Sequence, residues 1–372
     1  MGFYYKQYPR NNIFIKGLKA NKVEVYEYNI QSKSIIFNLK SFLKNFKKLK
    51  NKNFDLIILF SELPIQFMLA RILAYIKRIP FVHDIYVSKL QSNIEDRNLY
   101  YRSKLLPKII WYIILYFLDL TECVFADYLL LDTNSHIKFF HEKFNIPIKK
   151  FRRIPIGALD NIFHPIDTKI GKQNKFIVGF WGTFIPLHGI KYIIKAAKML
   201  ENYKDIKFLL IGDGQTFKKN LDLAKKLNVT NIQFLRKNYL LNNQLHKLTQ
   251  IISTIDIGLG IFGSSKKTLQ AIPNKIYEGI AMKIPMITSN TPAIREEFIN
   301  NENIILCERR SPGSIAKSIL KIKNDEELRK KISINGYTLF KNKFSINHIG
   351  KTLVNILNNI KTDFWEKRTK NL

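Results

Sequence analysis

The chain has 372 residues, of which 46% are hydrophobic and 13% aromatic, and it carries a formal net charge of +32. Its length suits two domains of ordinary size, and its apolar content excludes a disordered chain. It shows no apolar run of the roughly 20 residues that a membrane-spanning helix needs, no apolar signal segment at its start and no cysteine pattern typical of disulfides or metal clusters, so we expect a cytoplasmic protein.

The positive charge is distributed over the whole chain. Residues 1–170 hold 27 Lys and Arg against 14 Asp and Glu, and the remaining residues are also strongly basic. Asn, Ile and Lys dominate everywhere, as they do in proteins of a strongly AT-biased genome, so codon bias is one explanation. An anionic partner is the other, and acidic lipid headgroups, nucleic acid and nucleotide diphosphates all fit it.

The N-terminal half alternates between strand-like and helix-like patterns. Strands are predicted at 23–28, 56–60, 79–84 and 128–131, and helices near Asn11 and at 41–50, 63–77 and 135–144. This alternation predicts a parallel, doubly wound sheet. The polar, charged residues 86–108 predict a long mobile loop. We expect His83 where a strand gives way to this loop, a usual place for ligand contacts, although a histidine that merely caps the strand end fits equally well.

Residues 109–118 are ten consecutive apolar or aromatic residues, with Lys104 and Lys108 just before them. The run is too short to span a bilayer. Our first interpretation is a buried helix. The alternative is an interfacial helix at an acidic membrane, because the aromatic residues and the basic residues upstream suit such a surface.

A polar stretch at 167–174 is the best domain boundary. We expect an N-terminal domain at 1–168, a C-terminal domain at 174–345 and a terminal helix at 346–372 that packs back on the N-terminal domain. In the second half, strands are predicted at 176–180, 207–211, 232–235, 255–262, 284–288 and 303–307, and helices at 188–200, 217–227, 240–252, 314–323 and 326–335. Two doubly wound domains would present their strand ends across a cleft, which is the default ligand site.

A predicted helix start at Pro273-Asn274-Lys275 is the strongest candidate for a binding site. The unpaired N–H groups of a helix start can hold an anion, and Lys275 adds a positive charge. Glu278, one turn further on, offers a carboxylate suited to the paired hydroxyls of a ribose. Phosphate and ribose together indicate a nucleotide. The alternative is a helix with solvated charges and no ligand.

Short motifs along the chain then resemble those of a known family. They are Phe180-Trp181-Gly182-Thr183-Phe184, His188-Gly189-Ile190, Ile211-Gly212-Asp213-Gly214, Asn274-Lys275-Ile276-Tyr277-Glu278 and Pro285-Met286-Ile287-Thr288, with Tyr8-Pro9-Arg10-Asn11, Val82-His83-Asp84, Pro155-Ile156-Gly157 and Phe163-His164-Pro165 in the N-terminal half. In order and spacing they resemble the family 4 glycosyltransferases (glycosyl transferases group 1), retaining enzymes of the GT-B architecture. The resemblance is strongest from about 176 to 310.

The resemblance implies an enzyme with two Rossmann-like domains. The C-terminal domain would bind a nucleotide sugar, and the N-terminal domain a glycan or lipid-linked acceptor. No cofactor or divalent metal is expected, and the sequence contains no Asp-x-Asp pair. Cationic side chains and helix N-termini would then neutralise the leaving diphosphate.

The resemblance also implies roles for individual residues. Glu278 would bind the ribose hydroxyls, Gly182 and Thr183 would flank the diphosphate, His83 would lie close to the transferred sugar, and Arg236 would contact the base. The full set of candidates is His83 and Gln270 as catalytic residues, Gly182, Thr183, His188, Arg236, Asn274, Lys275 and Glu278 as donor-binding residues, and Arg10 in an acceptor or phosphate loop.

Three positions depart from the family pattern. Gln270 stands where the first of two glutamates is usual, so that position brings no charge to a developing oxocarbenium ion. Thr183 and His188 replace the usual Arg and Lys of the phosphate loop, so we assign the diphosphate to Lys275 with His188 as a weaker candidate. Lys283 stands in place of a glycine, which costs roughly 1 kcal/mol if its backbone is left-handed.

The leading hypothesis is a hexosyltransferase that builds a cell-surface polysaccharide, peripheral on the inner face of the cell membrane. A basic nucleic-acid-binding protein would explain the charge but not the ordered motifs, and no nucleic-acid recognition motif accompanies them. A GT-B protein without activity is the third hypothesis, because Gln270 and the missing phosphate-loop pair are consistent with it.

Overall fold

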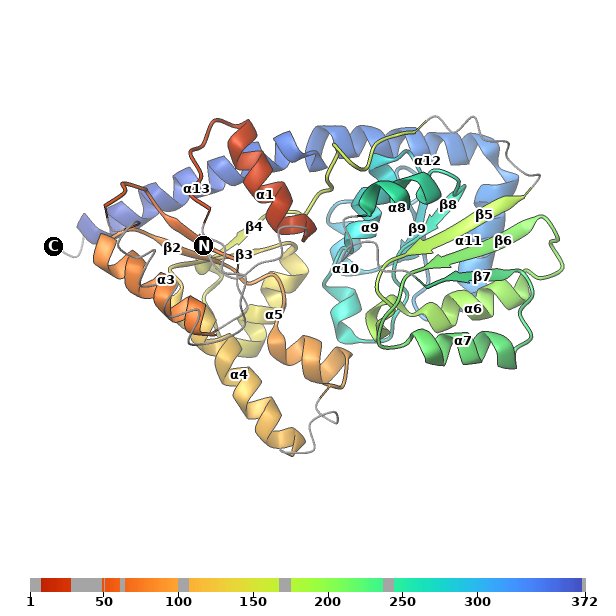
Figure 1. The fold of residues 1–372 in the computed structure, drawn as a ribbon, viewed down its shortest axis with the longest axis horizontal. Coiled ribbons are helices and arrows are strands. Elements are labelled where there is room, and N and C mark those ends of the chain that lie inside the picture. The colour runs from red at the N-terminus through yellow and green to blue at the C-terminus, as the bar shows by residue number, and fades with distance from the viewer. Residues whose placement is uncertain are drawn as a thin grey trace. The chain divides into compact units, whose positions relative to one another are not determined.

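The computed structural model describes residues 8–27, 49, 51–60, 64–99, 107–166, 175–236 and 244–369. The chain forms two compact units, each built on a parallel β-sheet with helices around it (Figure 1). Unit 1 comprises residues 1–155 with 349–372, and unit 2 comprises residues 156–348. The predicted class, α/β with two doubly wound units, is confirmed. The predicted boundary at 168–174 lies outside the described residues.

Unit 1 has a four-stranded sheet in the order β1-β2-β3-β4, with every neighbouring pair parallel. The strands are β1 (Ile57–Leu59), β2 (Phe81–Asp84), β3 (Tyr128–Leu131) and β4 (Phe151–Arg153). The helices are α1 (Pro9–Ala20), α3 (Pro64–Lys77), α4 (Lys108–Phe125) and α5 (Asn134–Phe144), with a π-helix at Gln91–Asp96 and a 3-10 turn at Ile148–Lys150. β1 and β3 consist wholly of apolar or aromatic residues, as expected where both faces of a parallel sheet are covered. β2 ends in His83-Asp84 and β4 in Arg152-Arg153.

The long terminal helix α13 (Ile346–Thr369) places most of its length in unit 1. Its buried side chains Ile349, Leu353, Leu357 and Ile360 recur at helical spacing and form one stripe. At Gly350 this helix meets α1 so closely that a Cβ there would overlap the carbonyl oxygen of Gly17. The absence of a side chain at Gly350 therefore sets the distance between the two helices.

Unit 2 has a six-stranded parallel sheet in the order β10-β9-β8-β5-β6-β7. The strands are β5 (Phe176–Trp181), β6 (Ile206–Ile211), β7 (Ile232–Leu235), β8 (Ile257–Leu259), β9 (Met286–Ser289) and β10 (Ile305–Cys307). The helices are α6 (Ile190–Met199), α7 (Phe217–Lys226), α8 (Leu245–Ile252), α9 (Asn274–Ala281), α10 (Pro292–Arg295), α11 (Pro312–Asn324) and α12 (Glu326–Leu339). Alternate residues of β5 and β6, such as Val178 and Phe208, share a core with α6 and α11.

Several predicted elements differ from the structure. Residues 23–27 form no strand, and the predicted helix at 41–50 lies almost wholly outside the described residues. The segment 89–96 is helical and largely buried, so the prediction of a mobile loop is wrong for that part. Leu90 and Ile94 of this segment pack in the core of unit 1. Their neighbours in the sequence are mostly polar, so the pattern did not indicate that they are buried.

The apolar run 109–118 also differs from its first interpretation. It lies in helix α4, but Ile109, Ile113 and Phe117 are 63%, 47% and 57% exposed. The buried residues of α4 are instead Leu115, Asp119, Glu122 and Cys123. The prediction of a buried helix is therefore wrong, because the polar side chains of α4 face inward and much of its apolar surface faces outward.

Candidate functional site

The candidate site lies where the strand order of unit 2 reverses. From β5 the chain builds β6 and β7 on one side of the sheet, then returns to place β8 on the other side of β5. In open α/β sheets the connections after two such central strands diverge, and ligands bind outside their carboxyl ends. Helix α9, which follows β8 along the chain, begins in this region.

Glycines allow the loops after β5 and β6 to approach each other closely. Gly182 and Gly212 have φ angles of 135° and 145°, a region that residues with a side chain rarely adopt. A Cβ on Gly212 would overlap the carbonyl oxygen of Gly182. The loop after β5 therefore lies against the loop after β6, with bare backbone at its surface.

Lys275, in the first turn of α9, carries its ammonium group into this region. Its Nζ lies 3.9 Å from the centre of the Phe180 ring and 3.3 Å from where a Cβ on Gly182 would stand. The residue is only 4% exposed, and among the described residues Nζ has no hydrogen-bond partner. Burial lowers the pKa of Lys275 well below its usual value, while the charge of Glu278 acts in the opposite direction. A buried ammonium in this state favours an anion that would complete its coordination.

Glu278 lies one turn further along α9 and is held in place by Trp181. The indole Nε1 of Trp181 donates a hydrogen bond of 2.7 Å to Oε2 of Glu278, and both residues are buried. Burial raises the pKa of Glu278 to about 7, although the indole hydrogen bond and Lys275 both lower it. The carboxylate is therefore fixed in direction and close to its titration point near neutral pH.

Trp181 was not among the sequence candidates. The signal was present, because a buried indole N–H usually finds an acceptor and Trp181 is the last residue of the strand before Gly182. What the sequence could not supply was the partner, since Glu278 is 97 positions away.

His188 and Thr183 lie beside the same glycine loop. Nδ1 of His188 contacts the carbonyl oxygen of Thr183, and the imidazole Cε1 lies 3.8 Å from where a Cβ on Gly182 would stand. Asn274, next to Lys275, has a buried Oδ1 without a hydrogen-bond partner in the described part of the chain. The structure thus gathers Gly182, His188 and Lys275 around one loop.

Arg236 and Gln270 occupy the surroundings of this group. Arg236 follows β7, is 65% exposed along its side chain and donates a hydrogen bond of 3.1 Å to Asp213, which lies in the loop after β6. Gln270 caps the 3-10 turn Lys266–Leu269 and is half-buried.

His83 and Arg10 belong to unit 1: His83 lies at the carboxyl end of a strand, as expected, whereas Arg10 lies in a helix rather than on a loop. His83 is inside β2, 1% exposed, with Nδ1 3.4 Å from the carbonyl oxygen of Leu59 and Nε2 3.4 Å from Oε2 of Glu122. Arg10 is in the first turn of α1 and fully buried. Its guanidinium donates to both carboxylate oxygens of Asp84 at 2.8–3.0 Å and to the carbonyl oxygen of Ile154 at 3.2 Å.

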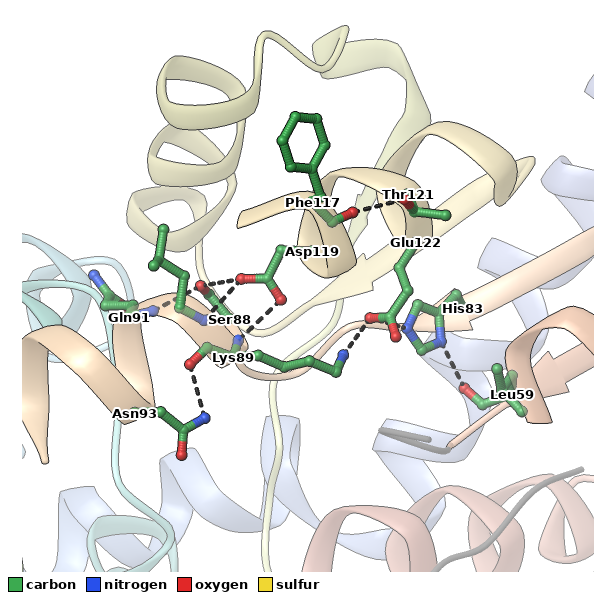
Figure 2. Close-up of polar contacts among 11 residues, drawn as sticks. Leu59, His83, Ser88, Lys89, Gln91, Asn93, Phe117, Asp119, Thr121 and Glu122 are labelled. Carbon is green, nitrogen blue, oxygen red and sulfur yellow. Dashed lines mark hydrogen bonds and ion pairs between the residues drawn. The ribbon is translucent and has the colours of Figure 1, made fainter. Parts of the chain in front are cut away.

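A polar network under α4 surrounds His83 (Figure 2). Lys89 forms an ion pair with the carboxylate of Glu122, which also faces His83. Asp119, one turn earlier on α4, accepts hydrogen bonds from Ser88 Oγ and from the backbone N–H groups of Lys89 and Leu90. The inward-facing carboxylates of α4 therefore hold the chain after β2, which explains why this helix turns its polar side inward.

Comparison with known proteins finds solved structures of similar fold and relatives of similar sequence. Solved structures of similar fold include Alr3699/HepE from Anabaena in complex with UDP and glucose (TM-score 0.67, 14% identity, 92% of this chain and 88% of that one). Another is sucrose-phosphate synthase from Thermosynechococcus elongatus (TM-score 0.65, 14% identity, 90% and 81%). At these identities the likeness concerns the fold alone, which is that of GT-B glycosyltransferases. Residues 164–339 match the family model described as glycosyl transferases group 1, which confirms the resemblance seen in the sequence over that part of the chain.

Curated relatives agree with this assignment. The chain is similar to the uncharacterized glycosyltransferase MJ1178 of Methanocaldococcus jannaschii (30% identity over 169 residues, 45% of this chain and 43% of the relative). It is also similar to the capsular polysaccharide biosynthesis glycosyltransferase CapM of Staphylococcus aureus (26% over 188 residues, 50% and 47%). These two matches span less than half the length of the relatives. A third, MJ1069 of M. jannaschii, is 25% identical over 347 residues, 88% of this chain and 82% of the relative.

Proposed function

We propose that this protein is a metal-independent, retaining glycosyltransferase that moves a hexose from a nucleotide sugar to a glycan or lipid-linked acceptor in cell-surface polysaccharide synthesis. The observation that carries the proposal is the buried ammonium of Lys275, which has no hydrogen-bond partner among the described residues and faces the Gly182 loop. The donor diphosphate is the anion that completes this site.

The diphosphate is bound by three kinds of group. Lys275 supplies a full positive charge, the N-terminal turn of α9 supplies unpaired N–H groups with the positive end of the helix dipole, and Gly182 lets the phosphates approach the backbone. His188, Thr183 and Asn274 add hydrogen bonds around them. These groups stabilise the negative charge that develops on the leaving diphosphate, the part that a divalent cation plays in other enzymes.

The rest of the donor lies further along α9 and across the sheet edge. Glu278 accepts hydrogen bonds from the ribose hydroxyls, and Trp181 holds the carboxylate in the direction that this contact needs. Arg236, at the end of β7, contacts the base. The complex of Alr3699/HepE with UDP and glucose supports a uridine nucleotide as the first donor to test.

The catalytic step involves His83 and Gln270 in this proposal. Gln270 hydrogen-bonds the transferred sugar through its neutral amide. His83 acts on the acceptor side, and Glu122 orients its ring from behind. The similarity to CapM supports a polysaccharide product, and a lipid-linked acceptor places the protein at the inner face of the cell membrane.

A thermal-shift screen against nucleotide sugars, followed by donor turnover, tests the function. We expect a uridine diphosphate sugar at about 100 times its dissociation constant to stabilise the protein by roughly 2.7 kcal/mol, and Glu278→Ala to abolish that shift. Release of the diphosphate from the donor establishes activity. A shift without release supports instead a GT-B protein that binds donors without transferring sugar, and no shift with any nucleotide sugar contradicts the proposal.

A further inference from the structure

Helix α4 exposes an apolar stripe along its whole length. The exposed apolar residues are Ile109, Ile110, Ile113, Ile114, Phe117, Val124 and Phe125, with exposed fractions from 38% to 63%. They recur at spacings of three, four and seven residues, so they form one face of the helix. Monomeric proteins rarely expose so many large apolar side chains on one element, and such faces mark interaction surfaces.

Helix α3 packs against α4 (Figure 1). It adds a second apolar face. Its exposed apolar residues are Met68, Ile72, Tyr75 and Ile76, with Tyr75 77% exposed. Their spacing of four, three and one places them on one side of α3 as well. We call these residues, together with the exposed stripe of α4, the α3–α4 apolar face.

Neither α3 nor α4 exposes a carboxylate, and basic residues stand at the ends of both helices. The only carboxylates of α4, Asp119 and Glu122, are buried, and α3 contains none. Lys108 begins α4, and Lys150 donates hydrogen bonds of 2.8 Å to the carbonyl oxygens of Cys123 and Val124 at its other end. Lys77, Arg78 and Lys149 provide further positive charge at the ends of α3 and of the turn Ile148–Lys150.

We propose that the α3–α4 apolar face docks on an anionic lipid bilayer, with its isoleucines and aromatic rings at the level of the acyl-chain boundary and the basic residues among the headgroups. Apolar faces of this kind flanked by Lys and Arg bind membrane surfaces, and each basic residue near an anionic leaflet strengthens the attachment. The partner is an anionic surface rather than a second copy, because another copy would bring the same net charge of +32. Among the described residues, no helix combines the length and the apolar character that a membrane span requires.

This inference deepens the proposed function, because it names the surface by which the enzyme would meet a lipid-linked acceptor. The docking proposal depends on the proposed function only for the reason why the enzyme would meet a membrane. The docking itself follows from exposure and charge in unit 1, whereas the donor site lies in unit 2.

Flotation with lipid vesicles tests the docking. The full-length protein is mixed with vesicles of phosphatidylcholine alone or with about one third phosphatidylglycerol, at low and high salt. We expect binding to the anionic vesicles only, and weakening with salt as charges are screened. Replacing Ile113 and Phe117 together by Glu should reduce the bound fraction at least tenfold, since two apolar anchors become anionic. The matched control is Ile334→Glu on α12, an equally exposed isoleucine at 58%, which should bind as the unmodified protein does.

A second variant tests the proposal without changing the apolar face, in case the first variant does not fold. Lys108→Glu with Lys149→Glu leaves the apolar face intact and should lower binding to anionic vesicles severalfold. Equal binding by all variants would overturn the proposal, as would a concentration-dependent dimer that the Ile113 and Phe117 changes dissolve while vesicle binding is absent. Titration with UDP and the other nucleoside diphosphates in the absence of vesicles separates this result from the donor site. Normal vesicle binding with no binding of any nucleoside diphosphate would refute the proposed function and leave the docking surface standing.

Discussion

When protonated, Lys275 carries a positive charge in a part of unit 2 that is almost completely shielded from water, and this burial lowers its pKa well below the usual value. Its compensation comes from the Phe180 ring at 3.9 Å and from the field of Glu278, and neither is a hydrogen bond. Such an arrangement lowers the stability of the unliganded protein and raises its affinity for an anion. Binding sites commonly retain groups of this kind because the ligand supplies what the protein leaves out.

Because the buried ammonium lowers the stability of the unliganded protein, removing it should be stabilising. Lys275→Met keeps the length of the side chain and removes the buried charge, so the free energy of unfolding without ligand should rise by about 1–2 kcal/mol. Urea denaturation of the unliganded protein measures it. Lys317→Met, on the exposed side of α11, is the control and should change the stability by less than about 0.5 kcal/mol. A loss of stability in Lys275→Met would show that the ammonium is already satisfied in the folded protein.

Glu278 predicts how donor affinity depends on pH. Because burial raises its pKa to about 7, the carboxyl group is mostly protonated below that pH and must ionise before it accepts from two ribose hydroxyls. Donor affinity should therefore fall as the pH decreases below 7, by up to about tenfold per unit. Lys275, whose pKa burial lowers, acts in the opposite sense by losing its proton as the pH rises.

The expected profile of affinity against pH therefore falls on the acidic side, and calorimetric titration with a uridine diphosphate sugar between pH 5.5 and 8 measures it. Glu278→Gln should flatten the acidic side only, because Lys275 and Trp181, the charged and hydrogen-bonding neighbours of this carboxylate, are unchanged. An acidic side that persists in Glu278→Gln would assign the titration to another group.

At this scale the sequence predicted much of the site in unit 2. Gly182, His188, Lys275 and Glu278 were expected from a helix start and from family motifs, and the structure brings the first three to one loop. Trp181 was missed because a tryptophan at a strand end has no recognisable partner until the fold is known. The role proposed for His83 stays a prediction, although its position at the carboxyl end of a strand was anticipated correctly.

At the scale of elements, the close contact between α1 and α13 depends on the absence of a Cβ atom at Gly350. Gly350 lies so close to the Gly17 carbonyl and to Nδ2 of Asn21 that a methyl group there would have to move backbone. Gly350→Ala should therefore lower the stability of the protein by about 1–3 kcal/mol, measured by chemical denaturation.

Gly313→Ala is the matched control for that substitution. Gly313 is also helical, in α11, but a Cβ there would meet only Met199 Cε at 3.7 Å, an ordinary contact. Alanine at this position should be neutral or stabilising by up to about 1 kcal/mol. Equal effects of the two substitutions would mean that α13 adjusts to α1 without cost.

The apolar helix α4 shows where sequence patterns stop being informative. Ten consecutive apolar residues have no periodicity that distinguishes an inward from an outward face. The orientation is set by Asp119 and Glu122 further along the helix, whose carboxylates bind the segment after β2. Those contacts are long-range, so the sequence supplied only the two alternatives. At Lys283 the family resemblance was informative, because the structure shows the left-handed backbone, φ 57°, that the usual glycine at this position implies.

At the scale of the whole molecule, regular alternation of strands and helices predicted two parallel sheets, and both are present. The strand order and register depend on pairings between distant segments, which composition and periodicity do not encode. The net charge of +32 is likewise ambiguous by itself. Individual positive charges indicate a function only once the structure gives their positions. Those positions are the ends of α3 and α4, beside the exposed apolar residues, and the buried side chain of Lys275.

The central claim is that the first turn of α9 binds the diphosphate of a nucleotide-sugar donor. Calorimetric titration with UDP tests it most directly, on the unmodified protein, on Lys275→Met and on Lys317→Met. We predict that UDP binds the unmodified protein and Lys317→Met equally, and Lys275→Met at least tenfold more weakly, since a charge-assisted hydrogen bond contributes about 1.5–3 kcal/mol. An equal affinity in all three proteins, or no binding of UDP or any other nucleoside diphosphate to the unmodified protein, would contradict the claim.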